Sequence, residues 1–332
     1  MQKHIFVCTT ILSFYQIDEI VRINHIPKEN VIIFNPKKLR LNHHICIKDK
    51  YLFIEPQDDY PSGKINRLFF LKRSYSLLVK SIQVTNQDIF YLQNLDNYLC
   101  NWIASKYNFC HLEDGMLNIY GYSHNYISFF SRCIKSCLSI LALKKFNPFF
   151  LFRKGFSRPL YATFPCRLLN NDKHLYSKTI ELYDWLNIYK RKSSLLQKNA
   201  YIIIGQETVT SDEEMYFMDI LNLIDKIRIL NEKSIIYYCP HPFYKGREHL
   251  FFKNKHYDIL VNIDYPSEIY ISENNILNVI SIFSTVSLHM SLTGNYNIYH
   301  YNTKKYYGSD AEHIMNKINS IDINSLTDTM KK

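Results

Sequence analysis

The stretch Tyr237-Tyr238-Cys239-Pro240-His241-Pro242 follows the apolar pair Ile235-Ile236 and ends a strand-like run on a histidine held between two prolines. Proline fixes its own φ and restricts the residue before it, so we expect the imidazole on a stiff, non-helical corner. Ligands of open α/β sheets bind beyond the carboxyl ends of the strands. The stretch therefore predicts a titratable ring at such an edge, although taken alone it also fits an ordinary turn.

The residues around this stretch alternate between strand-like and helix-like patterns. A strand predicted at 201–204 ends at Gly205-Gln206-Glu207, and Ser211–Glu214 fits a capping box that starts a helix. One face of that helix is expected to be buried, and it carries Met218, Leu221, Ile224 and Ile227. Further strands are predicted at Ile259–Val261, Val279–Phe283 and Asn297–His300.

The amino-terminal half shows the same alternation. Strands are predicted at Ile5–Cys8, Val31–Phe34, Asp88–Tyr91 and Asn108–Leu112. Helices are predicted at Leu12–Ile23, Asp96–Lys106, Tyr126–Phe150 and Lys178–Lys190. Residues 35–80 give a mixed pattern, which we interpret as rich in loops around Pro56 and Pro61-Ser62-Gly63.

Two successive blocks of strands and helices predict an α/β fold with two Rossmann-like domains facing across a cleft. We expect residues 1–190 to form the first domain, which includes a basic helical region at 126–190. Residues 191–332 are expected to form the second domain.

The composition narrows the class of protein. The 332 residues are enough for two domains with sizeable cores. The eight cysteines include no C-x-x-C pair, which favours free thiols in a reducing compartment over disulfides or zinc. The apolar run Ile5–Val7 is too short for a signal peptide, and the uncharged run between Lys135 and Lys144 is too short to cross a bilayer. We therefore expect a cytoplasmic protein.

The formal net charge of +10 is concentrated in one region. Residues 126–198 contain 14 Lys and Arg against three acids, a net charge of +11. Such a region suits an anionic membrane surface, a phosphate-bearing substrate or nucleic acid, and it equally fits a solvated basic surface. Peripheral contact with an anionic inner-membrane surface is therefore one expected interaction.

Two adjacent acids, Glu113 and Asp114, follow the strand predicted at 108–112, and Gly115 permits a sharp turn after them. A carboxylate buried at the cleft can act as a general base when its pKa suits a hydroxyl proton. An ordinary acidic turn would explain the same residues.

Hydroxyl side chains follow the strand predicted at 279–283. Ser284 and Thr285 stand where a helix would begin, and free backbone N–H groups there can bind phosphate together with the hydroxyls. N-capping is the other common use of such residues, and the two uses are compatible. Upstream, Ser267-Glu268 places a carboxylate that can accept both hydroxyls of a ribose.

In this order, the segments resemble the bacterial sialyltransferases of glycosyltransferase family 52, the lipooligosaccharide α-2,3-sialyltransferase group. Residues 6–12 resemble the family's first strand and loop, Glu113-Asp114-Gly115 its acidic motif and Pro240-His241-Pro242 its HP motif. Ser267–Tyr270 resembles its nucleotide-ribose segment and Phe283-Ser284-Thr285 its phosphate segment. The acidic and HP motifs also occur in other bacterial sialyltransferases and polysialyltransferases.

The resemblance implies a GT-B fold in which the second domain binds a CMP-sugar and the first domain lies on the acceptor side. It implies CMP-sialic acid as donor, a galactose-terminated surface glycan as acceptor, and inversion with no cofactor and no metal; the sequence also has no Walker, GxGxxG, HExxH or Asp-x-Asp motif. His241 would protonate or stabilise the departing CMP phosphate. The implied donor-binding residues are Pro240, His241, Pro242, Ser267, Glu268, Ser284 and Thr285.

The catalytic base has two candidates under this resemblance. In related enzymes an Asp of the acidic motif is the base, which points to Asp114 with Glu113 behind it. Other members use an acid after the first strand of the second domain, where this sequence has Glu207 in place of the family's Asp. That departure favours Asp114. Some members form dimers through the first domain, so a homodimer is also implied.

Three alternatives stay open. The first is a transferase of another CMP-sugar or a polysialyltransferase, and the second is a glycan-binding relative without activity. The third is a basic nucleic-acid-binding protein, suggested by tyrosines interspersed with lysines. The sequence contains no recognisable nucleic-acid-binding motif, so we do not expect nucleic acid as a partner.

Overall fold

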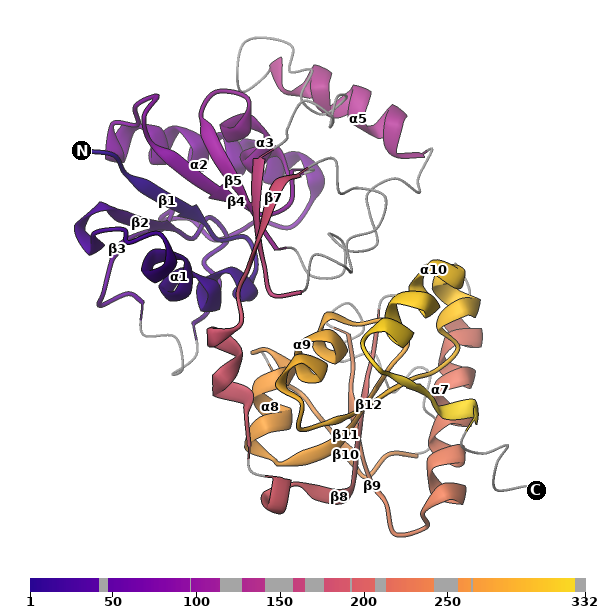
Figure 1. Cartoon of the computed structure of the whole chain (residues 1–332). Coiled ribbons are helices and arrows are strands. Elements are labelled where there is room, and N and C mark those ends of the chain that lie inside the picture. The colour runs from indigo at the N-terminus through magenta and orange to yellow at the C-terminus, as the bar shows by residue number, and fades with distance from the viewer. Residues whose placement is uncertain are drawn as a thin grey trace. The chain divides into compact units, whose positions relative to one another are not determined.

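The chain divides into two compact units, unit 1 (Met1–Trp185) and unit 2 (Leu186–Lys332), each built on a parallel β-sheet (Figure 1). The sequence analysis expected the division after residue 190. The computed structural model describes residues 1–41, 47–95, 97–113, 127–140, 158–164, 176–191, 193–206, 213–241, 256–263 and 265–325.

The sheet of unit 1 has seven described strands, all paired in parallel. They are β1 (His4–Val7), β2 (Val31–Phe34), β3 (Leu52–Ile54), β4 (Ile89–Leu92), β5 (Asn108–Leu112), β6 (Arg158–Ala162) and β7 (Tyr176–Glu181). Their spatial order is β3-β2-β1-β4-β5-β6-β7. The strand order reverses beside β1, so the topological switch point of this sheet lies between β1 and β4.

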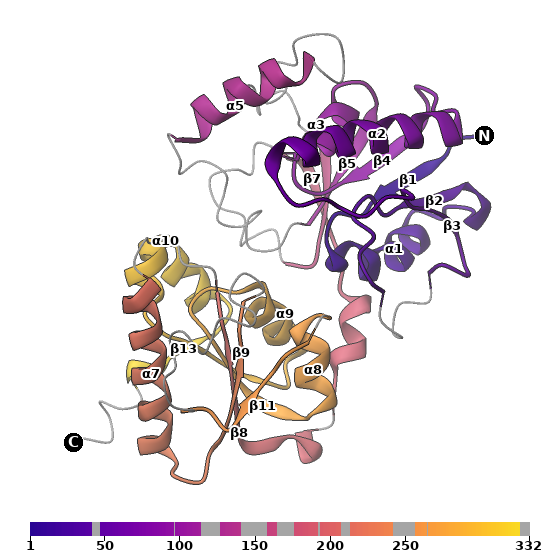
Figure 2. The same ribbon diagram turned by 180° about the vertical axis from the view of Figure 1, so that it is seen from behind.

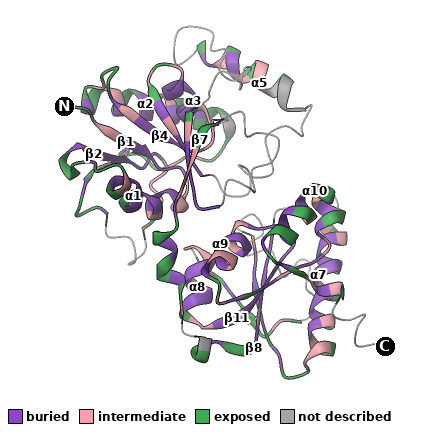
Figure 3. Cartoon of the chain, viewed as in Figure 1, coloured by how far each residue is buried: buried purple, intermediate pink, exposed green. Residues whose placement is uncertain are grey.

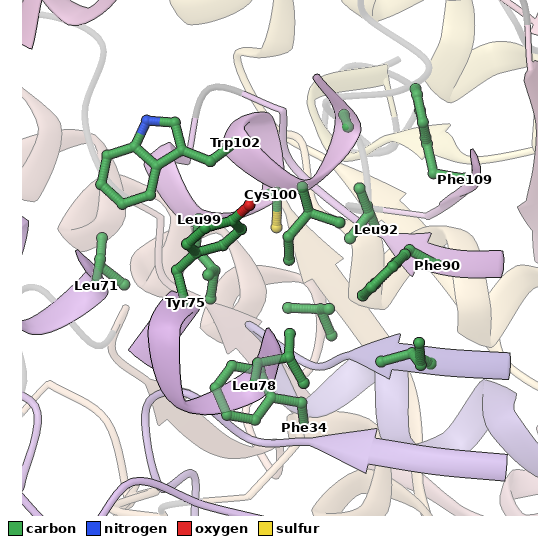
Figure 4. Close-up of a cluster of buried hydrophobic side chains, with 14 of the residues drawn as sticks. Phe34, Leu71, Tyr75, Leu78, Phe90, Leu92, Leu99, Cys100, Trp102 and Phe109 are labelled. Atoms are coloured by element: carbon green, nitrogen blue, oxygen red, sulfur yellow. The ribbon is translucent and has the colours of Figure 1, made fainter. Parts of the chain in front are cut away.

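Helices cover both faces of this sheet. α1 (Ile11–Ile23) lies on one face, and α2 (Lys64–Ile82), α3 (Tyr98–Ala104) and α5 (Ile127–Leu138) lie on the other (Figures 1 and 2). A short 3-10 helix, η1 (Lys28–Asn30), precedes β2. The core under α2 and α3 is largely aromatic and aliphatic, and Figure 4 labels Phe34, Leu71, Tyr75, Leu78, Phe90, Leu92, Leu99, Cys100, Trp102 and Phe109 in it.

One helix of unit 1 was not predicted from the sequence, and one prediction for this unit is wrong. The loop predicted around Pro56 and Pro61-Ser62-Gly63 is present, but the mixed pattern after it hid the 19-residue helix α2, which begins at Lys64. The helix predicted at 178–190 is replaced by strand β7 and the 3-10 helix η6 (Asp184–Tyr189). The segment forms a strand because it pairs with β6. Only its first residue is buried, so its sequence lacks the apolar pattern of a buried strand.

The last residues of unit 1 are held by one buried carboxylate of α1. Glu19, 7% exposed, accepts hydrogen bonds from the backbone N–H groups of Tyr183 (3.0 Å), Asp184 (3.1 Å) and Trp185 (3.1 Å). Backbone N–H groups at the start of a helical turn lack partners within the turn, and a carboxylate stabilises them. The contact therefore fixes the start of η6 against α1.

The sheet of unit 2 has six described strands, also all paired in parallel. They are β8 (Gln197–Ile204), β9 (Ile235–Cys239), β10 (Ile259–Leu260), β11 (Ile276–Ser281), β12 (Asn297–His300) and β13 (Ile321–Asp322). Their order, β10-β9-β8-β11-β12-β13, matches the first six strands of unit 1 and places the switch point between β8 and β11.

The helices of unit 2 lie on both faces of its sheet. α7 (Glu213–Leu230) and α10 (Thr303–Lys317) lie on one face, and α8 (Ser267–Glu273) and α9 (Thr285–Thr293) lie on the other (Figures 1 and 2). A 3-10 turn, η7 (Ser193–Leu195), precedes β8.

The predicted buried face of α7 is correct only in part. Ile224 and Ile227 are buried, but Met218 is 52% exposed and Leu221 is only partly buried. The core instead receives Tyr216, Phe217, Ile220 and Leu223.

The burial pattern follows this layering. Buried residues lie on the strands and on the inward helix faces, and exposed residues on the outer helix faces (Figure 3). No helix in the described parts of the chain has both the length and the apolar character needed to span a membrane.

Candidate functional site

Three of the predicted segments meet at the carboxyl edge of the unit 2 sheet. Pro240 and His241 follow β9, Gly205 and Gln206 follow β8, and Ser284 lies shortly after β11. These three strands are neighbours, so their ends lie together at the switch point. Pro240 is buried and His241 is partly exposed. The edge thus combines a fixed imidazole with the start of helix α9.

Gly205 allows the loop after β8 to pass close to the His241 corner. Its backbone N–H donates to the Cys239 carbonyl at 2.7 Å. A Cβ at this position would lie 2.8 Å from the His241 backbone nitrogen and 3.0 Å from the Cys239 carbonyl oxygen. Real Cβ atoms essentially never come within 3.0 Å of such an atom, so any side chain would move the corner.

Gln206 links β8 to β11 across the switch point. Its Oε1 accepts from the Phe283 backbone N–H at 2.5 Å, and its Nε2 donates to the Phe283 carbonyl. Its own backbone N–H donates to the hydroxyl of Tyr216 at 2.8 Å. This link was not predicted from the sequence, where its one signal is a polar residue directly after a buried strand end.

Ser284 is the N-cap of α9, and Thr285 is its first residue. The Ser284 side-chain oxygen accepts from the Val286 backbone N–H at 3.2 Å. One turn on, the Ser287 hydroxyl lies 2.7 Å from the hydroxyl of Ser281, the last residue of β11. A helix start with N–H groups and hydroxyls at a switch point can bind an anion such as phosphate.

Ser267 and Glu268 begin helix α8 beside the same edge. The Ser267 hydroxyl lies 3.3 Å from the Cys239 thiol, which joins α8 to the end of β9. Glu268 is 7% exposed, and its Oε1 lies 2.9 Å from Nδ1 of His289 on α9. His289 is 1% exposed.

His289 was not identified from the sequence. It occupies a helix position among apolar residues, where histidine usually signals only a satisfied core side chain. Its pairing with Glu268 joins α8 to α9, and this holds the carboxylate in one orientation. The structure thus brings His241, Ser267, Glu268, Ser284 and Thr285 to elements that contact one another directly or through Cys239 and Gln206.

The acidic segment of unit 1 lies at the carboxyl edge of the other sheet. Glu113 follows β5 and is fully buried. Its Oε2 accepts from the side-chain amide of Gln16 at 3.0 Å and from the Thr163 backbone N–H at 2.7 Å. Its carboxylate therefore stabilises the ends of β5 and β6. Asp114, Glu207 and Pro242 lie outside the described residues.

Gln93, which follows β4, joins this acidic segment to the loop after β1. Its Oε1 accepts from the backbone N–H groups of Thr9 (3.3 Å) and Thr10 (3.1 Å). Its Nε2 donates to the Thr10 hydroxyl at 2.8 Å and to the Glu113 carbonyl at 3.0 Å. One amide therefore crosses the switch point of unit 1.

The described cysteines are free thiols: Cys8, Cys100, Cys110, Cys133, Cys137 and Cys239. Burial raises the pKa of Cys8 to about 12 and that of Cys110 to about 11. A thiol with a raised pKa is a poor nucleophile. Within the described ranges, no group of three His, Cys, Asp or Glu residues is placed to hold a metal ion.

Comparison with known proteins identifies the fold. No protein-family model and no curated protein matches the sequence. The UDP-GlcNAc 2-epimerase from Neisseria meningitidis bound to UDP-GlcNAc is similar with a TM-score of 0.61 at 10% identity, over 100% of this chain and 91% of that chain. A putative UDP-N-acetylglucosamine 2-epimerase from Listeria monocytogenes gives a TM-score of 0.58 at 10% identity, over 90% and 78% of the two chains.

A plant structure shows the same fold. Medicago truncatula UGT71G1 complexed with UDP-glucose gives a TM-score of 0.51 at 10% identity, over 92% of this chain and 84% of that chain. The protein thus consists of two parallel-sheet α/β domains of the GT-B type, the predicted fold class. At such identities the likeness shows the fold alone, and membership of glycosyltransferase family 52 stays a prediction.

Proposed function

We propose that this protein is a glycosyltransferase that moves sialic acid from CMP-sialic acid to a terminal galactose of a bacterial surface glycan. The observation that carries the proposal is the convergence of the His241 corner, the Ser267-Glu268 pair and the Ser284-Thr285 helix start at one switch point. The structural neighbours crystallised with UDP-GlcNAc or UDP-glucose support a sugar-nucleotide donor for this fold.

The charge that develops during transfer explains these residue types. As the bond to sialic acid breaks, negative charge grows on the CMP phosphate, and fixed donors at that point lower the barrier. The α9 start, with its N–H groups and the Thr285 hydroxyl, would bind the phosphate. His241, held by Pro240 and by the approach of Gly205, would donate the proton or stabilise the charge. Glu268 would accept the ribose hydroxyls.

The burial of Glu113 refines the assignment of the base. Its carboxylate already accepts from Gln16 and Thr163, so we assign Glu113 to positioning and Asp114 to proton abstraction from the acceptor hydroxyl. Glu207 is the competing base. A homodimer and metal-independent inversion complete the proposal.

Product analysis with a panel of donors tests the proposal. The purified protein is incubated with CMP-sialic acid, CMP-Kdo or UDP-GlcNAc, with and without labelled lactose. Mass spectrometry of the products should show sialyl-lactose from CMP-sialic acid, unchanged by EDTA, and linkage analysis would identify the bond formed. Transfer from CMP-Kdo alone would reassign the donor.

The structural neighbours define the opposite result. Epimerisation of UDP-GlcNAc, followed by NMR, without transfer from either CMP-sugar would overturn the sialyltransferase proposal. Binding of CMP without donor hydrolysis or transfer would indicate a glycan-binding relative without activity.

A further inference from the structure

Helix α2 of unit 1 presents apolar and basic side chains along one exposed stripe. Ile65 is 72% exposed, Phe69 49% and Leu77 36%, at spacings of four and eight residues. Residues three and four apart are neighbours on a helix surface, so Ile65, Phe69, Arg73 and Leu77 form one continuous row. Between and beyond them the same side carries Lys72, Arg73 and Lys80, of which Arg73 and Lys80 are exposed.

Helix α5 also turns apolar side chains outward. Phe130 is 73% exposed and Ile134, one turn on, is 45% exposed. Ser136 of α5 and Ser139, directly after it, are fully buried, and the Ser139 hydroxyl accepts from Trp102 Nε1 on α3 at 3.0 Å. A helix packed only on its own domain normally buries its apolar face.

The two helices lie on the same face of the unit 1 sheet. Leu138 of α5 packs against the core cluster that contains Leu78 of α2 and Trp102 of α3. Two ring contacts join the three helices, because Tyr75 of α2 meets Trp102 edge-on and Lys135 of α5 lies over the Tyr98 ring. Figures 1 and 2 both show α2, α3 and α5 opposite α1. We call the exposed side chains of α2 and α5 the α2–α5 surface.

Both helices belong to stretches of sequence without acids. Residues 60–87 contain five Lys and Arg and no Asp or Glu. Residues 115–171 contain eight Lys and Arg and no Asp or Glu. Arg73 of α2 contacts Asp58, which lies before this helix, at 3.2 Å. The sequence that contains these apolar side chains therefore carries net positive charge.

We propose that the α2–α5 surface binds peripherally to an anionic phospholipid bilayer. The apolar side chains would enter the boundary between headgroups and acyl chains, and the cations would contact lipid phosphates. A second copy of the chain fits less well, because two surfaces of the same charge would face each other. Nucleic acid could bind the cations through its phosphates, but it has no apolar interior in which Ile65, Leu77 and Ile134 could be buried. This inference does not depend on the sugar-nucleotide chemistry.

Vesicle co-sedimentation of the full chain tests the inference. The vesicles contain phosphatidylcholine alone or phosphatidylcholine mixed with phosphatidylglycerol, at low and high salt. We expect sedimentation with the anionic vesicles only, reduced by salt. Lys72→Glu/Lys80→Glu should lower the partition coefficient at least tenfold, since each cation near an anionic surface contributes roughly fivefold.

The apolar contribution is tested by Ile65→Ser/Phe69→Ser and Phe130→Ser/Ile134→Ser. Each pair should lower the partition coefficient roughly tenfold, because the apolar area that enters the bilayer is lost. The matched controls lie in unit 2: Lys198→Glu/Lys233→Glu for charge, and Met218→Ser/Ile229→Ser for exposed apolar side chains of α7. These controls should sediment like the unchanged protein, and thermal unfolding checks that every variant folds.

Five results would overturn the inference, and the first four concern the vesicles and the variants. The first two are absence of binding to anionic vesicles and equal binding to neutral vesicles. The third is an equal loss of vesicle binding in the control variants. The fourth is light scattering in which the α2 and α5 variants dissociate an oligomer while no form of the protein binds vesicles. That result would assign the surface to contact between copies. Sedimentation abolished by competing random DNA at equal phosphate, with the serine variants unaffected, would likewise replace the bilayer by nucleic acid.

Discussion

Units 1 and 2 share one strand order but build the carboxyl edges of their sheets differently. After the first strand, Cys8 in unit 1 and Gly205 in unit 2 occupy the same place, since each donates its N–H to the end of the second strand: Cys8 to the Phe34 carbonyl at 2.9 Å and Gly205 to the Cys239 carbonyl at 2.7 Å. Unit 1 accommodates a side chain there, and unit 2 does not. The difference brings the His241 corner close to β8.

A glutamine crosses the switch point in both units, but from opposite sides. In unit 1, Gln93 extends from the fourth strand to the loop after the first. In unit 2, Gln206 extends from the first strand to the segment after the fourth. A neutral amide can donate and accept at once, so it satisfies backbone groups at a sheet edge without adding charge. Both units have such a crossing, and its direction differs between them.

The largest effect is expected on catalysis, at the carboxyl edge of the unit 2 sheet. His241→Ala should reduce transfer by roughly 100-fold to 1000-fold, the usual effect of removing one group that stabilises the charge of the transition state. His313→Ala, an exposed histidine of α10, is the matched control and should retain full activity. Initial rates with CMP-sialic acid measure both, and circular dichroism checks folding. Full activity in His241→Ala would contradict the leaving-group role.

Glu268 and Glu113, buried carboxylates beside the carboxyl edges of the two sheets, offer the next comparison. His289→Ala leaves Glu268 without the hydrogen bond that joins it to α9, and it should cost about 3 kcal/mol of unfolding free energy. Gln16→Ala leaves Glu113 bonded to the Thr163 N–H and should cost only about 1.5 kcal/mol.

Urea unfolding measures both variants. The two tryptophans, Trp102 and Trp185, lie in unit 1, so their fluorescence follows unit 1, and circular dichroism follows both units. Equal losses of unfolding free energy would show that His289 stabilises the fold through Glu268 no more than Gln16 does through Glu113.

The residues after the first strands allow a smaller test. Gly205→Ala should cost about 2 kcal/mol through overpacking and should reduce transfer roughly tenfold by moving the His241 corner. Cys8→Ala removes one buried sulfur and should cost about 1 kcal/mol without an effect on transfer. Urea unfolding and initial rates separate the two. Unchanged transfer in Gly205→Ala would show that the close approach does not position His241.

Acid sensitivity should be the smallest effect, and it should be present in both units. Burial lowers the pKa of His300 in unit 2, opposed by Asp322 and Glu312, and burial lowers the pKa of His4 in unit 1, opposed by Asp88. Below the ordinary pKa of 6.5, the unfolded chain binds protons that the folded chain resists, so the free energy of unfolding falls as the pH drops through that value.

One histidine variant in each unit separates the contributions of the two units to this acid dependence. His300→Gln should flatten the acid dependence of the circular dichroism transition, and His4→Gln that of the tryptophan fluorescence transition. A steeper acid dependence in either variant would mean that the histidine stabilises the fold on protonation, opposite to the expected sign.

Local sequence predicted much of the fold because parallel strands are short, apolar and bounded by polar or proline residues. It missed α2, whose buried Leu71 and Leu78 alternate with exposed Phe69 and Leu77, so the helix has no clean apolar face. It predicted a helix in place of β7, an edge strand whose identity depends on pairing with β6.

The site was predictable only for residues with local signatures. His241 and Ser284 stand beside prolines or at a strand-to-helix turn, and their positions follow from neighbouring residues. Gln206 acts on a residue 77 positions away, and His289 on one 21 positions away. Contacts of that separation leave no pattern in the local sequence.

The Glu19 contact with residues 183–185 has a consequence for synthesis of the protein. It involves the last residues of unit 1, so every described strand of unit 1 and its closing contact have been translated when Trp185 is added. The 54 residues from 186 to Cys239, the end of the β9 strand that pairs with β8, then take roughly 3 to 11 s at typical translation rates. A nascent chain can therefore complete its amino-terminal sheet on the ribosome before the first strand of unit 2 has a partner.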